Sequence, residues 1–148
     1  MKFTSHKAIN GSVAVFLGFD LMGIVTMTLG SVLPDIIDKT LSGNSEIVWS
    51  RVHRTLSHWW FIWALILYFS HRNSDIFVLS MPVFKIVSHL AFGSLLHILC
   101  DSMTLGGVPL FNPFRQSFGL RLFYTGSPQE YVFVTIIAST LLYFGVGK

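Results

Sequence analysis

The sequence predicts an all-α integral membrane protein: a bundle of about five helices with an N-terminal helical hairpin and a long interfacial loop before the last helix. Of its 148 residues, 52% are hydrophobic and only 11% are charged, whereas soluble domains carry about 25% charged residues. The mean hydropathy is +0.63. Apolar segments cover residues 8–33, 59–69, 76–100 and 131–146. The length fits one membrane-embedded domain over residues 1–148.

The first apolar segment has two interpretations. Residues 8–33 are long enough to cross a bilayer core of about 30 Å as one tilted helix, but the stretch "FLGFDLMG" interrupts them with Gly18, Asp20 and Gly23. A single span buries Asp20 at mid-membrane, which is costly. A hairpin instead places residues 18–20 in a turn between helices near 7–18 and 21–33, although such short helices reach only about 18 Å.

The distribution of lysine and arginine favours the hairpin. A single span places five basic residues on each side of the membrane, so the positive-inside rule sets no orientation. The hairpin places seven on the side where Asp35 emerges and three on the other. By the same rule, the side with Asp35 is then cytoplasmic.

The next two apolar segments predict two further helices. Residues 59–69 lead from the side of Asp35 to a polar turn at 70–75, and residues 76–100 return. Pro82 indicates that the second of these helices begins near residue 84, because proline is tolerated only before or in the first turn.

A long loop at 102–129, rich in glycine, proline and phenylalanine, precedes the last helix at 131–146. Loops of this length in a compact domain are usually functional or interfacial. We expect its aromatic side chains to rest in the membrane interface and hold an acyl chain: Phe111, Phe114, Phe118 and Phe123.

On this topology the polar groups at several helix ends lie on one side of the membrane. His97 and Asp101 are four residues apart and therefore share one helix face, a chelating arrangement. Imidazole and carboxylate together suit zinc first, with manganese or iron as alternatives. The candidates exceed the three or four ligands of one zinc, so one or two ions are expected. They are His6, Asp35, Asp38, His53, His58, His97, Asp101 and Glu130.

We divide these residues by expected role. Asp38 or Glu130 is expected to relay a proton, and Arg54 to bind an anionic group of the substrate. Simpler structural roles are open for each: helix capping, a solvated loop acid, or contact with anionic lipid. His71, His89 and Cys100 are interpreted as structural. The predicted metal ligands are His6, Asp35, His53, His58, His97 and Asp101.

Composition also limits the partners. The formal net charge of +3 on so apolar a chain favours anionic membrane lipids. No lysine- and arginine-rich run or aromatic RNA-binding motif is present, so no specific nucleic-acid binding is expected. The single cysteine excludes an internal disulfide, and no cleavable signal peptide is evident. The sequence does not set the oligomeric state.

Five stretches, in this order, resemble the YdjM-like family of membrane-bound metal-dependent hydrolases: "SHKAINGSVAVF", "LGSVLPDIID", "HRTLSHW", "GSLLHILCDSMTLGGVPLFNPF" and "TGSPQE". The resemblance implies a bacterial inner-membrane protein, multi-pass, distantly similar to zinc-dependent phospholipase C and single-strand nucleases. It also implies the same six metal ligands. One departure stands out: Ile37 occupies the position of the family's second aspartate, and Asp38 that of its histidine. Either Asp38 substitutes as a ligand or one metal position is weakened.

The expected function is therefore metal-dependent hydrolysis. A metal-activated hydroxide would cleave a phosphoester of a lipid-like or membrane-proximal substrate, such as a lipid phosphate. The alternative is a non-catalytic metal-binding membrane protein that anchors a partner or serves as a small transport subunit. A mid-membrane Asp20 beside His89 would favour an ion pathway and hence this alternative.

Overall fold

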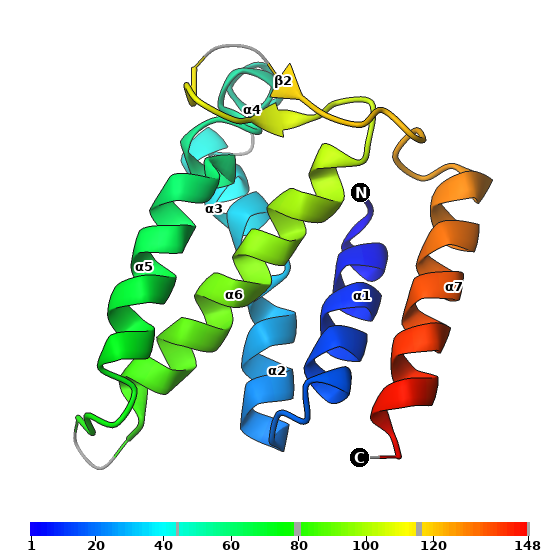
Figure 1. Cartoon of the computed structure of the whole chain (residues 1–148). Helices are drawn as coiled ribbons and strands as arrows, with labels where there is room; N and C mark the ends of the chain where they lie inside the picture. Colours follow the sequence, from blue (N-terminus) through cyan, green and yellow to red (C-terminus); the bar gives the residue numbers. More distant parts are fainter. Residues whose placement is uncertain (44, 79–80, 115–116, 148) are drawn as a thin grey trace.

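The computed structural model describes residues 1–43, 45–78, 81–114 and 117–147 and is mostly helical (Figure 1). The described part contains seven α-helices, one 3₁₀ turn and a two-stranded antiparallel sheet. They are α1 (Phe3–Phe16), α2 (Leu21–Gly30), α3 (Leu33–Ser42), α4 (Glu46–Val52), η1 (Leu56–His58), α5 (Trp60–Arg72), α6 (Val83–Ser102), β1 (Val108–Pro109), β2 (Ser117–Phe118) and α7 (Pro128–Gly145).

The long helices run alongside one another and leave two distinct ends. One end, called the site end below, holds the start of α1, helices α3 and α4, the C-terminus of α6 and the start of α7 (Figure 1). The opposite end holds the α1–α2 turn and the α5–α6 connection. α1 packs on α7 and α2, while α6 packs on α2 and α5.

The predicted N-terminal hairpin is confirmed. α1 ends at Phe16 and α2 begins at Leu21. Gly18 has a φ of +72°, a left-handed conformation that costs glycine little. Asp20 is the N-cap of α2, accepts a hydrogen bond from the Gly23 N–H at 2.7 Å, and pairs with Lys85 Nζ at 2.9 Å. The interrupted pattern therefore marks a turn rather than a buried acid.

Two glycines allow α2 and α6 to cross at close range. A Cβ at Gly93 would lie 2.2 Å from the Met27 carbonyl oxygen, and one at Gly30 would lie 2.2 Å from the Leu90 carbonyl oxygen. Small residues permit such contact between helix backbones in membrane bundles. The Ser94 hydroxyl donates to the Gly30 carbonyl at 3.0 Å across the same crossing.

The structure adds two short helices, α3 and α4, to the five that were expected. The prediction ended the second helix at residue 33, whereas α2 stops at Gly30 and α3 starts at Leu33. Pro34 in the first turn of α3 fits this break, because proline lacks the N–H that a continuing helix would need. α3 has only ten residues, which is too short for its apolar face to stand out in the hydropathy of the sequence. As a result, Asp35 and Asp38 lie on a helix rather than in a loop.

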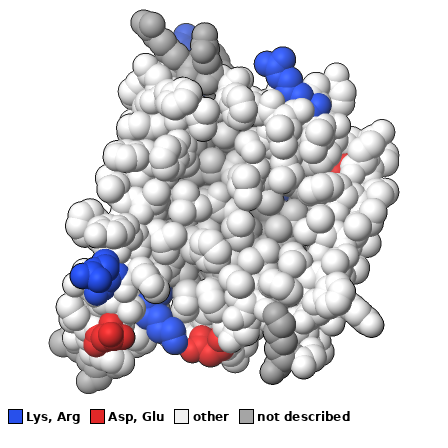
Figure 2. Space-filling view, in the orientation of Figure 1, with Lys and Arg blue, Asp and Glu red and all other residues white. Residues whose placement is uncertain are grey.

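Much of the side surface is apolar. Lys, Arg, Asp and Glu concentrate toward the two ends of the face shown in Figure 2. Exposed hydrophobic side chains lie along α2, α5 and α7, among them Val25, Leu29, Leu65, Phe69, Val132 and Ile136. Within the described residues, α6 is long and apolar enough to cross a membrane, and the pair α2 and α3, bent by 41°, would be a second span.

Candidate metal centre

Histidine and aspartate side chains from distant segments meet at the site end. α1, α3, η1 and α6 each deliver at least one of them, and His53 follows α4 directly. Three overlapping groups have ligand atoms within 4.8 Å of one another, and together they contain all six predicted metal ligands. The groups are His6, Asp35 and His97; Asp35, His53 and His58; and His58, His97 and Asp101.

Four of these side chains surround one point. The Nε2 atoms of His58 and His97 lie 3.1 Å apart. Asp35 Oδ1 lies 3.3 Å from His58 Nε2 and 3.8 Å from His97 Nε2, and Asp101 Oδ2 lies 3.7 Å from both nitrogens. Ligand atoms bound at the usual zinc distances in a tetrahedral site lie about 3.3 Å apart. The spacings of the two nitrogens from each other and from the two carboxylates are therefore compatible with a cation held between His58 and His97.

The tautomers of the two central histidines follow from their other nitrogens. His97 Nδ1 lies 2.6 Å from the Ser31 carbonyl oxygen, which can only accept, so this nitrogen carries the hydrogen. His58 Nδ1 faces Asp38 Oδ2 at 3.3 Å and the Ser57 hydroxyl at 2.9 Å. Because Ser57 donates its own hydrogen to Asp38, His58 Nδ1 is also the donor. In the neutral imidazoles both Nε2 lone pairs then face each other.

Facing lone pairs repel unless a proton or a metal cation lies between them. Two further groups lack a hydrogen bond of normal geometry among the described residues: Asp35 Oδ1 and both ring nitrogens of His6 are buried, although His6 Nε2 lies 3.3 Å from Asp101 Oδ1. Burial opposes the charged imidazolium of His58, but the Asp35 and Asp38 carboxylates, each with an oxygen 3.3 Å from a ring nitrogen, outweigh it and raise the pKa of His58. The surroundings thus favour positive charge at this point, and the donor set fits a divalent metal.

Asp38 contacts the Nδ1 atoms of His53 and His58. It lies outside the three ligand groups, its Oδ2 is 3.2 Å from His53 Nδ1, and it accepts a hydrogen bond from the Arg54 backbone N–H at 3.1 Å. A carboxylate on the outer nitrogen orients a metal-binding imidazole, and Asp38 has this position at His58, where it faces Nδ1 at 3.3 Å while Nε2 faces His97. Ile37, at the position of the family's second aspartate, packs on the apolar cluster around Trp63.

Arg54 closes the site toward the long loop. Its Nη2 pairs with Asp101 Oδ2 at 3.0 Å, and its Nη1 donates to the Thr104 hydroxyl at 3.2 Å and the Gly107 carbonyl at 3.0 Å. Its φ of +62° is left-handed, which is uncommon for a residue with a side chain. The Met1 amino group also donates to Asp101. Two cations therefore offset this one carboxylate.

Glu130 lies outside the described ligand groups. Its oxygens accept hydrogen bonds from the Lys2 N–H at 2.8 Å, the Ser5 hydroxyl at 2.5 Å and the Gly126 N–H at 2.7 Å. Burial alone would raise the pKa of Glu130, but these donors outweigh it and lower the pKa. In this structure the carboxylate joins the N-terminal segment to the start of α7.

Glu130→Gln is expected to lower the free energy of unfolding by about 1–3 kcal/mol near neutral pH, because one amide position must face a donor. The carboxylate pKa is lowered from its usual 4.5, so its contribution is present above that value and is lost as pH falls through the lowered pKa. Denaturant unfolding in detergent from pH 7 to pH 3 measures this. Glu46→Gln on exposed α4 is the control. A deficit in Glu130→Gln that stays constant over this pH range would contradict the assignment.

Sequence reasoning did not find the groups that orient the ligands. The Ser31 carbonyl and the Ser57 hydroxyl carry no sequence signal of their own, although Ser57 precedes a predicted ligand. Thr104 is fully buried and bonds Arg54. One expectation for the long loop is wrong: Phe123 is buried against Cys100 and Val134, because this part of the loop crosses the core between α6 and α7.

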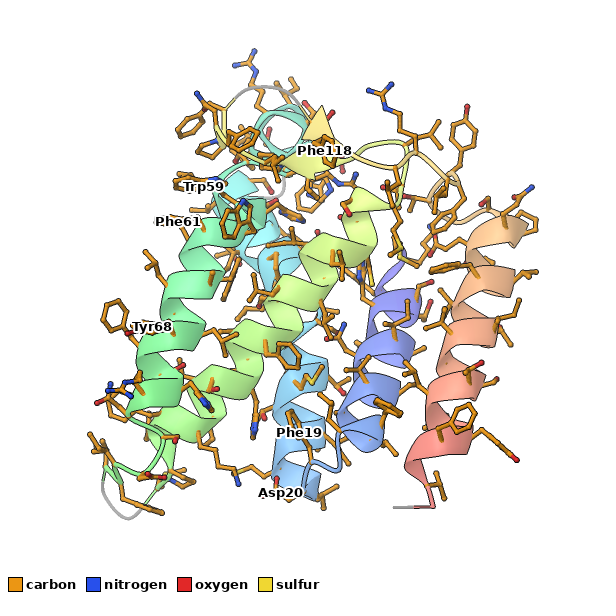
Figure 3. All side chains as sticks on the ribbon, in the orientation of Figure 1. Phe19, Asp20, Trp59, Phe61, Tyr68 and Phe118 are labelled. Atoms are coloured by element: carbon orange, nitrogen blue, oxygen red, sulfur yellow. The ribbon has the colours of Figure 1, made fainter. Side chains whose placement is uncertain are left out.

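The other loop phenylalanines are exposed at the site end. Phe111, Phe114 and Phe118 have 86%, 71% and 55% of their surface exposed, and Figure 3 labels Phe118 at the same end as Trp59. Asp20 and Phe19 are labelled at the opposite end. The apolar loop and the candidate metal centre therefore share one end of the molecule.

Comparison with known families decides the affiliation. The family model described as "YdjM inner membrane protein" matches residues 2–147. The chain belongs to the YdjM family. No curated protein and no solved structure matches it.

Membership supports the predicted localisation in the inner membrane. The number of crossings of this YdjM-family chain and the side that its site end faces stay predictions, as do the metal and the hydrolase chemistry. The chain is therefore a member of an inner-membrane protein family with histidines and aspartates clustered at one end.

Proposed function

We propose that this chain is a metal-dependent hydrolase of the inner membrane that cleaves a phosphoester of a lipid-like substrate. The observation that carries the proposal is the convergence of the His58 and His97 Nε2 lone pairs with buried carboxylate oxygens. Uncompensated buried acceptors of this kind are costly. A divalent cation satisfies them together.

The proposed ligands of the first ion, zinc in the first instance, are Asp35, His58, His97 and Asp101. His6 and His53 extend the set at its two sides and allow a second ion, with Asp35 shared between the groups. When bound, a metal of this type polarises a phosphoester oxygen and lowers the pKa of a water.

The chain's own residues have supporting roles. Asp38 keeps the proton on Nδ1 of His58, so that Nε2 stays available. Arg54 uses three of its five N–H groups on Asp101, Thr104 and Gly107. We propose that its remaining donors bind an anionic oxygen of the substrate. Glu130 retains the proton-relay role only as a prediction, because its oxygens are engaged elsewhere.

The substrate class follows from the neighbourhood. Phe111, Phe114 and Phe118 expose large apolar surfaces on one loop at the site end, and grouped exposed apolar side chains mark membrane or protein interaction sites. We propose that this loop rests in the lipid interface and brings the centre to the level of lipid head groups. A phosphoester at that depth is reached without leaving the membrane surface.

The experiment is metal-dependent turnover. Detergent-purified protein is stripped with chelator, reloaded with zinc, manganese or iron, and assayed with bis-p-nitrophenyl phosphate and a short-chain phospholipid. We expect activity only after reloading, and a loss of at least about 100-fold in Asp35→Asn, because an ion without a ligand binds and polarises poorly. His71→Ala, at the opposite end of α5, is the control. Equal activity in stripped and reloaded protein would refute the proposal.

A non-catalytic metal site is the second candidate, and burial favours it. His6, His58 and His97 are fully buried, as in closed structural sites. Against it, the His53 side chain is 26% exposed and gives the centre one open side. The ion-pathway version loses its motivation, because Asp20 lies in an exposed turn and pairs with Lys85. Stoichiometric metal without turnover would select this candidate.

A further inference from the structure

We infer that the cavity formed by α1, α3 and α4 beside His53 binds the anionic end of the substrate, with Lys39 as the group that contacts it. This inference rests on the proposed function and names an entrance and a binding residue for the same centre. The cavity measures about 430 Å³. Its lining residues are Phe3, Lys39, Ser42, Ser45, Glu46 and Trp49.

Lining residues from three helices lie close in sequence or in space to residues of the candidate centre. Phe3 lies one helical turn before His6 on α1, and Ser42 lies one turn after Asp38 on α3. Trp49 stacks on His53, with ring centroids 4.3 Å apart and planes at 17°. His53 is the most exposed of the six predicted ligands, with 26% of its side-chain surface accessible. The cavity therefore lies on the side of the centre where His53 is partly exposed, with the Trp49 ring next to both.

The cavity is lined by one positively charged and one negatively charged side chain, Lys39 and Glu46. Lys39 directly follows Asp38 and has no carboxylate within 4.0 Å among the described residues, so its ammonium is available. Glu46 lies on the facing helix, in the first turn of α4. An anion is therefore attracted on the Lys39 side and repelled on the Glu46 side. Both residues are exposed, so neither is needed for core packing.

Because the cavity carries one positive and one negative side chain, the two substitutions are expected to change phosphate affinity in opposite directions, which a purely structural effect would not do. Lys39→Met is expected to weaken binding of inorganic phosphate about fivefold, and Glu46→Gln to strengthen it by a similar factor, the size that one partly screened charge contributes. Both differences are expected to shrink at high salt. Arg72→Gln removes one positive charge at the opposite end and is expected to leave binding unchanged.

Calorimetric titration of phosphate into detergent-purified protein measures the dissociation constants, and metal content is measured on the same samples. Opposite shifts in the two variants with unchanged metal content support the inference. Equal shifts, no shift, or no phosphate binding to the unchanged protein would overturn it. The proposed function fails separately, through absent metal or absent turnover, because phosphate binding is read without catalysis.

Discussion

His97→Gln is expected to remove at least one metal ion per chain, with an affinity loss of more than about 100-fold, since even outer partners of metal ligands are worth 10–100-fold. His97 belongs to two of the three ligand groups. Its ring is fully buried, so no solvent ligand replaces it at low cost. Elemental analysis of purified protein, followed by competition with a metal indicator, measures the loss.

Matched variants separate metal binding from folding. Asp35→Asn keeps the shape of its side chain and is expected to lose metal similarly, because an amide is a poor replacement for a shared carboxylate. His71→Ala, exposed at the end of α5, is expected to keep the full metal content. Metal content equal to the unchanged protein in both His97→Gln and Asp35→Asn would show that the cluster does not bind the ion.

Gly93→Ala is expected to lower the free energy of unfolding by about 1–3 kcal/mol, the usual cost of overpacking a close contact. The added Cβ would lie 2.2 Å from the Met27 carbonyl oxygen, and this neighbour is backbone, which cannot turn aside. α2 and α6 must therefore separate. Denaturant unfolding in detergent, followed by helical circular dichroism, measures the change.

Gly11→Ala is the matched control. Gly11 is also helical, and its added Cβ would meet the Thr28 hydroxyl at an ordinary 3.6 Å. Alanine there is expected to leave stability unchanged or raise it by about 0.4–1 kcal/mol, because it restricts the unfolded chain. Equal effects of the two substitutions would show that the α2–α6 crossing is not tightly packed.

Gly93→Ala is also expected to weaken metal binding at the candidate metal centre. The Ser31 carbonyl that fixes the His97 ring directly follows Gly30, on the helix that Gly93 contacts. If α2 moves away from α6, the 2.6 Å hydrogen bond lengthens first. We expect Gly93→Ala to bind metal more weakly although it changes no ligand.

Local chemistry explains which parts of the structure were predictable. The α1–α2 turn was predictable, because an aspartate flanked by glycines inside an apolar segment is costly to bury in the membrane and is expected at a turn. The six predicted metal ligands lie close together as expected, because each lies near a helix end and the membrane pattern placed those ends on one side. The i, i+4 pair of His97 and Asp101 needed only helix periodicity.

Other features depend on tertiary contacts that leave no periodic signal. α3 and α4 are too short for hydropathy to separate from a loop. The tautomers of His58 and His97 are set by Ser57 and the Ser31 carbonyl, which reach them only in the folded chain. Phe123 looks like its exposed loop neighbours in the sequence, yet the path of the loop between α6 and α7 buries it.

The ligand groups span residues 6 to 101 and come from five separate segments. During biogenesis the centre therefore cannot assemble until α6 has emerged and docked, whatever cation is present earlier. A ligand that binds only the native state stabilises it by mass action. Metal supply would then act as a checkpoint on maturation, and cells starved of the ion are expected to show faster proteolytic turnover of this chain than replete cells.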